Sequence, residues 1–131
     1  MEELKNKMLE DKNWAVIGFT PNEDKYGYKI YKKLKENKYN VHPVNPKYED
    51  YKEFKVYNSI KEVKEKIDSV SVVVPPKVSE KLLEELKNTD IKNIWFQPGT
   101  FDENIIEKAE NLGFNIVFYD CVLVELGKKF D

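Results

Sequence analysis

The sequence predicts a single Rossmann-like α/β domain: a doubly wound, mostly parallel sheet of about five strands with helices on both faces. Short apolar segments alternate along the chain with amphipathic ones, which is the pattern of a parallel sheet with helical crossovers. The apolar segments are nearly continuous, as expected for strands that are covered on both faces. At 131 residues the chain fits one such domain, 1–131, and no linker, repeat or low-complexity segment divides it.

The composition favours a cytoplasmic protein and argues against several function classes. The 22 basic and 24 acidic residues nearly cancel, whereas a general nucleic-acid binder needs a clustered basic excess. Cys121 is the only cysteine, so no internal disulfide can form. Residues 1–12 lack the apolar centre of a signal peptide, and no apolar run approaches the ~20 residues that cross a bilayer. We therefore expect neither nucleic acid nor membrane as a partner.

The amino-terminal part is predicted to hold two helices and two strands before an irregular segment. Apolar spacing predicts helices over 2–11 and 26–37 and strands over 14–18 and 41–44. The irregular segment, 47–57, carries tyrosines at positions 48, 51 and 57. These tyrosines either build a partner surface, with a homodimer as one candidate, or simply cover the segment.

The next two elements are predicted from a capping pattern and from β-branched residues. Ser59 precedes Glu62 by three residues, the capping-box spacing, and this predicts a helix to about Lys66. The β-branched run 70–74 is bounded by Pro75-Pro76 and is typical of a strand.

The last part of the chain is predicted to complete the alternation. Ser79 is expected to cap a helix that ends near residue 88, and a strand follows over 91–96. Asp102 is expected to cap the next helix, and Gly113 to stop it. A final strand over 115–118 precedes a short terminal helix or tail.

The residues that interrupt the apolar pattern follow the predicted strands. In a doubly wound sheet, ligands bind outside the carboxyl ends of the strands, where the strand order reverses. The sequence therefore predicts a ligand site at this edge, built from these segments: Gly18-Phe19-Thr20, Asn45-Pro46-Lys47, Pro75-Pro76, Gln97-Pro98-Gly99 and Asp120-Cys121.

The stretch from Trp14 to Gly27 has the form of a phosphate-binding turn. A strand stops at Gly18, passes through a polar loop and enters a helix, so free N–H groups and the positive end of the helix dipole are expected to face the loop. Gly18 permits a positive φ or a close approach to a ligand. The alternative is an ordinary strand-to-helix turn.

The pattern does not match the common nucleotide fingerprints. The glycine that follows Gly18 is Gly27, so neither G-x-G-x-x-G nor a Walker loop is present. The second strand ends in Asn45 rather than in an acidic residue that would bind ribose hydroxyls. Lys47 suits a phosphate on a ribose, which NADP and coenzyme A both carry.

Six short motifs together resemble one family, the Rossmann-type CoA-binding domain. This domain occurs as small stand-alone bacterial proteins and as the N-terminal domain of the succinyl-CoA synthetase α-subunit. The resemblance covers nearly the whole chain after Trp14, and the order and spacing of the motifs carry it. The motifs are Gly18-Phe19-Thr20-Pro21-Asn22, Val44-Asn45-Pro46, Val56-Tyr57-Asn58-Ser59-Ile60, Val73-Val74-Pro75, Trp95-Phe96-Gln97-Pro98-Gly99 and Asp120-Cys121.

The resemblance implies that coenzyme A, or an acyl-CoA, is the ligand, and it also implies a placement. The phosphates would be held by the loop and helix start: Gly18, Phe19, Thr20, Pro21, Asn22, Lys25, Tyr26 and Gly27. Adenosine and the ribose phosphate would border Asn45, Pro46 and Lys47. Val74, Pro75 and Pro76 would flank the adenine or the pantetheine, whose arm would lie near Gln97, Pro98 and Gly99. Cys121 either forms a mixed disulfide with the coenzyme or is a small buried hydrophobe.

No catalytic or metal-binding arrangement is evident in the sequence. His42, the only histidine, falls within a predicted strand, where a packed residue is expected rather than a catalyst. One histidine and one cysteine do not make a metal site. We expect a non-catalytic binding protein. The alternatives are an NADP-dependent reductase or reductase subunit on the same fold, and a regulatory partner whose site has degenerated.

Overall fold

Five parallel strands form one sheet in the order β2-β1-β3-β4-β5 in the computed structural model, which describes residues 2–48 and 55–130. The strands are β1 (Asn13–Ile17), β2 (Asn40–Val44), β3 (Ser69–Val72), β4 (Asn93–Phe96) and β5 (Asn115–Val117). The helices are α1 (Glu2–Glu10), α2 (Tyr26–Glu36), α3 (Pro76–Leu86), α4 (Glu103–Asn111) and α5 (Val122–Phe130), with a 3-10 turn, η1, at Ile60–Glu62. The predicted α/β fold is confirmed.

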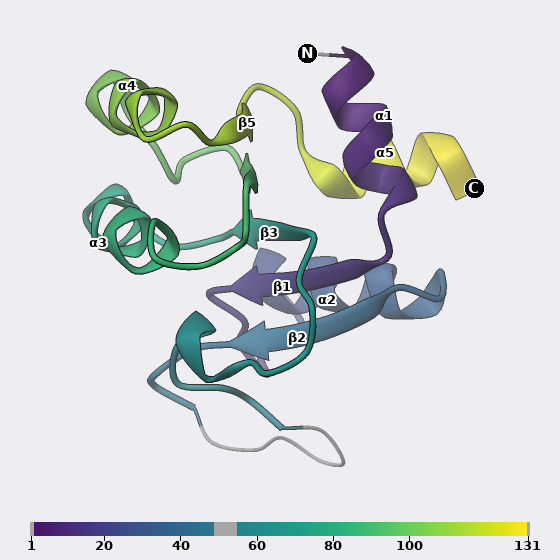
Figure 1. Cartoon of the computed structure of the whole chain (residues 1–131). Coiled ribbons are helices and arrows are strands. Elements are labelled where there is room, and N and C mark those ends of the chain that lie inside the picture. Colours follow the sequence, from purple (N-terminus) through teal and green to yellow (C-terminus); the bar gives the residue numbers. More distant parts are fainter. Residues whose placement is uncertain (1, 49–54, 131) are drawn as a thin grey trace.

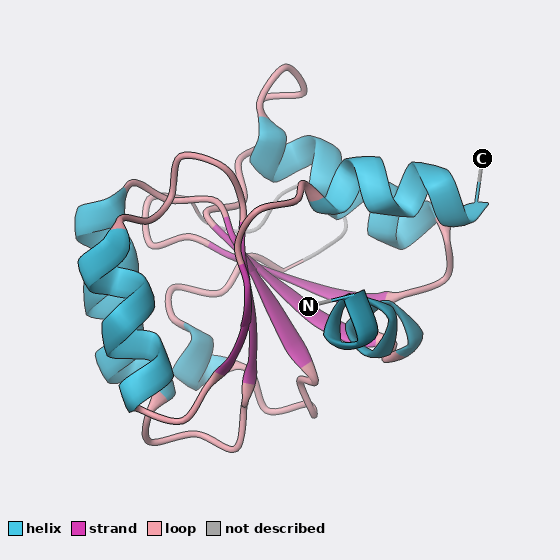
Figure 2. Ribbon diagram, turned by 90° about the horizontal axis from the view of Figure 1, so that it is seen from above, coloured by secondary structure: helices cyan, strands magenta, loops and turns pink. Residues whose placement is uncertain are grey.

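Helices cover both faces of the sheet, so each strand contributes to two cores. Figure 1 shows α3 and α4 on one side of the strands and α1 and α5 on the other, and Figure 2 shows the sheet between these layers. Within β1, Trp14 and Val16 pack in the α1–α2–α5 core, whereas Ala15 and Ile17 pack in the α3–α4 core. Because alternate residues point to opposite faces, two buried faces require the nearly continuous apolar strands seen in the sequence.

The strand order creates a switch point at the carboxyl ends of β1 and β3. From β1 the chain proceeds outward to β2 and then returns across β1 to β3. Ile17 is in register with Val44 of β2 and with Val72 of β3, so the three strands end level with one another. The loops that follow them therefore meet at one place, the position at which doubly wound sheets bind ligands.

The predicted helix from Ser59 to Lys66 is wrong, because only η1 forms there. Val63 already has extended backbone angles of φ −76° and ψ 116°. The Ser59 hydroxyl accepts a hydrogen bond from the Lys61 amide and donates one to Glu85 Oε1 on α3, so it does not make a capping box. A contact with another element has replaced the local pattern, as often happens where helix propensity is weak.

The start of α3 was also predicted wrongly, since the helix begins at Pro76 and Ser79 lies inside it. Pro75 occupies the N-cap position and Pro76 the first turn, where a missing N–H costs nothing. The Ser79 hydroxyl is buried and has no hydrogen-bond partner among the described residues. The strand before it ends at Val72, which leaves Val73 and Val74 in the loop.

The end of the chain agrees more closely with the predictions. The Asp102 carboxylate caps α4 by accepting a hydrogen bond of 2.8 Å from the Ile105 amide. Gly113 has a φ of +91° just after α4, so it stops the helix as predicted. The terminal segment forms the helix α5. Within residues 2–48 and 55–130, no helix is long and apolar enough to cross a bilayer.

Candidate functional site

A cavity of about 440 Å³ lies at the carboxyl edge of the sheet, at the switch point. Six predicted site residues line it: Gly18, Asn45, Pro46, Lys47, Val74 and Pro75. The remaining lining residues were not predicted as ligand contacts: Ile17, Val44, Asn58, Ser59, Ile60, Val73, Val78, Leu82 and Glu85. Loops after three adjacent strands thus meet one face of α3 around this cavity.

The turn after β1 depends on two glycines. Gly18 has a φ of +103°, and a Cβ there would lie 2.4 Å from the Val73 carbonyl oxygen. A Cβ on Gly27 would lie 2.4 Å from the Gly18 carbonyl oxygen. Both distances are far below any real contact, so the loops after β1 and β3 and the first turn of α2 pack backbone against backbone. Gly27 therefore has a packing role in this structure.

The expectation of free amides at the start of this loop is wrong. The amides of Gly18 and Phe19 both donate to the Val44 carbonyl oxygen, at 2.9 and 3.3 Å. The Asn22 amide donates to Thr20 Oγ1 at 3.2 Å, and the Asp24 amide donates to Asn22 Oδ1 at 3.0 Å. The loop consequently uses these N–H groups to hold its own shape.

The first turn of α2 offers donors that the loop does not. This helix begins at Tyr26 with no side-chain cap on its N-terminus and no acidic residue in its first turn. The first N–H groups of a helix have no partner within the helix, and the dipole makes this end positive. The amides of Tyr26, Gly27 and Tyr28 are therefore the ones suited to an anion.

Two polar residues of the loop after β2, Asn45 and Lys47, line the larger cavity and have different roles. Asn45 Nδ2 donates to the Phe19 carbonyl oxygen at 2.8 Å, while Asn45 Oδ1 accepts from the Lys47 amide at 2.9 Å. Asn45 therefore ties the loop after β2 to the loop after β1. Lys47 is exposed at the cavity, and its ammonium forms no ion pair with any residue of the described ranges.

One wall of the cavity comes from α3, and sequence reasoning missed it. Val78, Leu82 and Glu85 are spaced i, i+4, i+7, so they lie on one helix face. Glu85 also accepts a hydrogen bond of 2.7 Å from the Ser59 hydroxyl. The signal was present in the sequence, but the predicted helix start at Ser79 left Val78 outside the helix and concealed the spacing.

A second, small cavity of about 70 Å³ lies beside the first, and Val73 lines both. Four predicted site residues line the small cavity, namely Tyr26, Gln97, Pro98 and Cys121, together with Ile30 of α2. Cys121 is half-buried with a free thiol. The predicted contacts therefore divide between two hollows on either side of Val73.

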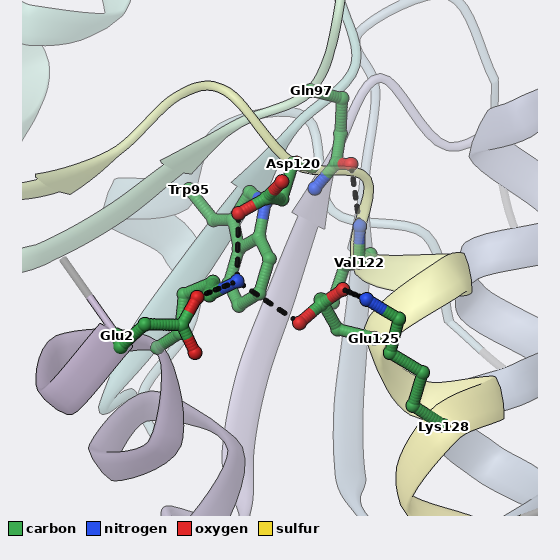
Figure 3. Close-up of polar contacts among 8 residues, drawn as sticks. Glu2, Trp95, Gln97, Asp120, Val122, Glu125 and Lys128 are labelled. Carbon is green, nitrogen blue, oxygen red and sulfur yellow. Dashed lines mark hydrogen bonds and ion pairs between the residues drawn. The ribbon is translucent and has the colours of Figure 1, made fainter.

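Gln97 is held by the protein at both ends of its side chain. It is buried, its Nε2 donates to Ser71 Oγ at 3.0 Å, and its Oε1 accepts from the Val122 amide at 3.0 Å. These bonds join β3, the loop after β4 and the N-terminus of α5, and Figure 3 shows the last of them. Gln97 fixes the frame of the small cavity.

The segment that carries Cys121 is also clamped by a buried ammonium. Lys5 Nζ lies 2.7 Å from Asp120, 3.0 Å from Glu125 and 2.6 Å from Glu2. These carboxylates raise the pKa of Lys5, chiefly through Asp120, and Lys5 lowers the pKa of Glu125. The Trp95 indole N–H donates to the Asp120 carbonyl oxygen at 2.7 Å. Figure 3 shows these groups converging between α1 and α5.

The other predicted site residues line neither cavity. The Phe19 side chain is fully buried in the core under α2, so only its backbone lies at the edge. Thr20 Oγ1 donates to the Tyr48 hydroxyl at 3.3 Å. The remaining ones are Pro21, Asn22, Lys25, Gly27, Pro76 and Gly99. Tyr51, predicted as part of a partner surface, lies outside the described residues.

The chain is similar to known proteins in sequence and in structure. The family described as "CoA binding domain" matches residues 12–127. A hypothetical protein from Pyrococcus horikoshii OT3 is 31% identical, with a TM-score of 0.89 over 97% of this chain and 89% of that chain. A conserved hypothetical protein from Pyrococcus furiosus is 36% identical, with a TM-score of 0.82 over 87% and 98%. A search of curated proteins found no match.

Proposed function

This chain belongs to the CoA binding domain family, and on that premise we propose that it binds coenzyme A or an acyl-CoA at the carboxyl edge of its sheet. The observation that carries the proposal is the cavity of about 440 Å³ at the switch point, with the ammonium of Lys47, which pairs with no residue in 2–48 or 55–130, at its rim. A nucleotide with a ribose phosphate needs a hollow and a cation of this kind.

The larger cavity suits the adenosine end of the coenzyme. Val74, Pro75 and Val78 form an apolar wall for the adenine ring, and Pro75 also fixes the backbone there. Glu85 and Ser59 supply acceptors for amine or hydroxyl hydrogens. Lys47 is the residue that we assign to the ribose phosphate.

The diphosphate is assigned to the first turn of α2. The amides of Gly18 and Phe19 are already bonded to Val44, so the donors would be those of Tyr26, Gly27 and Tyr28. An uncapped helix start is a ready site for a phosphate because its N–H groups and its dipole act together. The side chains of Thr20, Asn22 and Lys25 stay as proposed neighbours of the phosphates.

The pantetheine arm is assigned to the side of Val73 that faces the small cavity. Tyr26, Gln97, Pro98 and Cys121 line that cavity, and its volume of about 70 Å³ limits it to a small group. A water molecule occupies roughly 30 Å³, so a thiol or a short acyl group is the largest end that fits.

We propose binding without catalysis. His42 lies in β2, is half-buried, and lines neither cavity at the carboxyl edge. Burial lowers its pKa, and among the described residues no group of histidine, cysteine and acidic side chains is arranged to hold a metal ion. The described residues at this edge supply hydrogen-bond donors and acceptors, apolar walls and the ammonium of Lys47, a combination that suits ligand binding.

Calorimetric titration of the full chain tests the proposal. We expect saturable heat with CoA and acetyl-CoA, weaker binding of 3′,5′-ADP because it lacks the pantetheine arm, and no saturable heat with NADP at the same concentration. Binding of NADP alone would favour the reductase alternative. No response to any of the four ligands would contradict a nucleotide site on this edge.

A further inference from the structure

A groove at one end of the sheet shares no lining residue with the two cavities described above. It lies between α4 and the segment that follows β5, and its volume is about 550 Å³. Figure 1 shows α4 and β5 together at the end of the sheet away from β2. The lining residues are Phe101, Asp102, Glu103, Ile106, Glu107, Glu110, Phe118 and Tyr119.

The floor of this groove is aromatic. The ring centroids of Phe101 and Phe118 lie 5.6 Å apart in an edge-to-face arrangement, and those of Phe118 and Tyr119 lie 4.2 Å apart. Tyr119 is 72% exposed, the largest exposed fraction among the large hydrophobic side chains of the described residues. Exposed aromatic clusters mark interaction surfaces, and the faces of the rings attract cations.

The rim of the groove is acidic and unneutralised. Glu103, Glu107 and Glu110 are spaced i, i+4, i+7 on α4, and all three are exposed. None of them forms an ion pair with a residue in 2–48 or 55–130. On the neighbouring α3, by contrast, Glu84 pairs with Lys87 at 2.8 Å and with Lys108 at 2.9 Å. Like charges on one helix face repel each other, so the i, i+4, i+7 spacing does not itself stabilise the helix, although Glu103 lies in the first turn, where the helix dipole favours an acidic side chain.

The chemistry of the groove selects among occupants. Nucleic acid and anionic lipid would be repelled by the rim. A single metal ion is not favoured, because no metal-binding group of three or more His, Cys, Asp and Glu side chains occurs among the described residues. A peptide with cationic and apolar side chains matches both the rim and the floor by charge and by surface type.

We propose that this groove docks a lysine- or arginine-rich peptide segment of a partner protein. The cationic side chains lie beside Glu103, Glu107 and Glu110, and the apolar side chains of the peptide pack on Phe118 and Tyr119. Charge complementarity carries the proposal, which is independent of the function assigned to the switch-point cavity.

The test uses a defined peptide as the probe. The ¹⁵N-labelled full chain is titrated with acetyl-Lys-Phe-Lys-Leu-Arg-amide and, separately, with acetyl-Glu-Phe-Glu-Leu-Glu-amide while amide chemical shifts are recorded. We expect shifts centred on residues 101–119 with the basic peptide alone. The affinity should fall by at least about threefold between low and high salt, because exposed charges are screened.

Two matched triple variants distinguish binding at the groove from nonspecific binding to acidic surface. E103Q/E107Q/E110Q should weaken binding of the basic peptide by at least about fivefold. E10Q/E36Q/E80Q removes the same charge from exposed positions elsewhere and should leave the affinity unchanged. Equal losses in both variants, shifts scattered over all acidic surfaces, or no response to the basic peptide would overturn the proposal.

Two further readouts complete the test. Sedimentation velocity shows whether the chain self-associates; a dimer that E103Q/E107Q/E110Q alone dissociates would identify a second copy as the occupant and overturn the peptide proposal. CoA titration of the same variant should give the heat of the unchanged protein. The docking proposal and the coenzyme proposal can therefore fail separately.

Discussion

At the carboxyl edge of the sheet, the polar side chains that follow β2 and β4 differ in burial and in their bonding to the rest of the protein. Lys47, in the loop after β2, is exposed at the larger cavity and pairs with no described residue. Gln97, in the loop after β4, is buried and bonded at both ends of its amide. Nearby, Lys5 contacts three carboxylates in almost complete burial.

The difference separates groups that hold the edge together from groups that remain available to a ligand. A polar side chain whose partners are all internal lowers the free energy of the folded chain, and its removal leaves those partners unpaired. A charged side chain without a partner contributes little to stability and can bind an anion. We therefore expect substitutions near β4 and α5 to change stability, and Lys47 substitutions to change affinity.

The largest loss of stability is expected from a substitution at Gly18, in the turn after β1. Gly18→Ala should lower the free energy of unfolding by about 3–5 kcal/mol, because it combines an unfavourable positive φ with a clash against Val73. Gly99→Ala is the matched control, since Gly99 has a φ of +88° but no atom within 4 Å of an added Cβ. It should cost about 1–2 kcal/mol. Urea denaturation measures both, and equal costs would contradict the packing argument.

The second largest loss of stability is expected when the Gln97 amide is removed. Gln97→Leu keeps most of the volume but strands the Ser71 hydroxyl and the Val122 amide, for an expected loss of about 2–3 kcal/mol. Lys47→Gln should change stability by less than about 0.5 kcal/mol. Thermal unfolding of the two variants checks this contrast, and a larger loss in Lys47→Gln would reverse it.

Removing Lys5 should lower the free energy of unfolding by somewhat less than Gln97→Leu does, because the carboxylates that Lys5 contacts differ in exposure. Lys5→Met leaves Asp120 without the Lys5 cation and leaves Glu125 paired with Lys128, and fully buried pairs lose about 3–5 kcal/mol when one partner is removed. Asp120 is 39% exposed and Glu2 is 79% exposed, so water compensates in part and we expect about 2 kcal/mol. Lys7→Met, at an exposed ion pair, should lower the free energy of unfolding by less than Lys5→Met does, because solvent screens the pair. Chemical denaturation compares the two variants.

The smallest expected effect is a pH dependence from β2, next to the loop of Lys47. Burial lowers the pKa of His42 below its ordinary value of 6.5, so the unfolded chain takes up this proton first as the pH falls. The free energy of unfolding should therefore decrease as the pH falls below about 6.5, and His42→Gln should flatten that decrease between pH 7 and pH 5. Glu125 adds a loss in the same direction only below its ordinary pKa of 4.5.

The fold could be predicted from the sequence because its signals are local. Apolar strands covered on both faces, the Asp102 cap and the Gly113 stop each depend on a few neighbouring residues. The predictions failed where distant elements decide the outcome. Ser59 caps only the short turn η1 and also bonds to Glu85 of α3, and Pro76 opens α3 before Ser79.

The meeting of the loops at the carboxyl edge of the sheet was predicted from the sequence, but the contacts of their side chains were not. The loops after the strands do meet at the edge, since parallel strands bring their carboxyl ends together. The sequence did not distinguish Gln97, whose amide is bonded internally, from Lys47, whose ammonium has no ion-pair partner in the described part of the chain. It also missed Val78 and Glu85, because their contribution depends on how α3 packs beside the cavity.

The central claim is that the switch-point cavity, with Lys47 at its rim, holds the phosphorylated ribose of coenzyme A. The most direct measurement is a thermodynamic cycle by calorimetry, with CoA and dephospho-CoA titrated into the unchanged chain and into Lys47→Gln. Lys92→Gln, at an exposed lysine outside this cavity, is the control. We predict that Lys47→Gln weakens CoA by about fivefold, or about 1 kcal/mol, and leaves dephospho-CoA unchanged. Equal affinities of the unchanged chain for CoA and dephospho-CoA would contradict the claim.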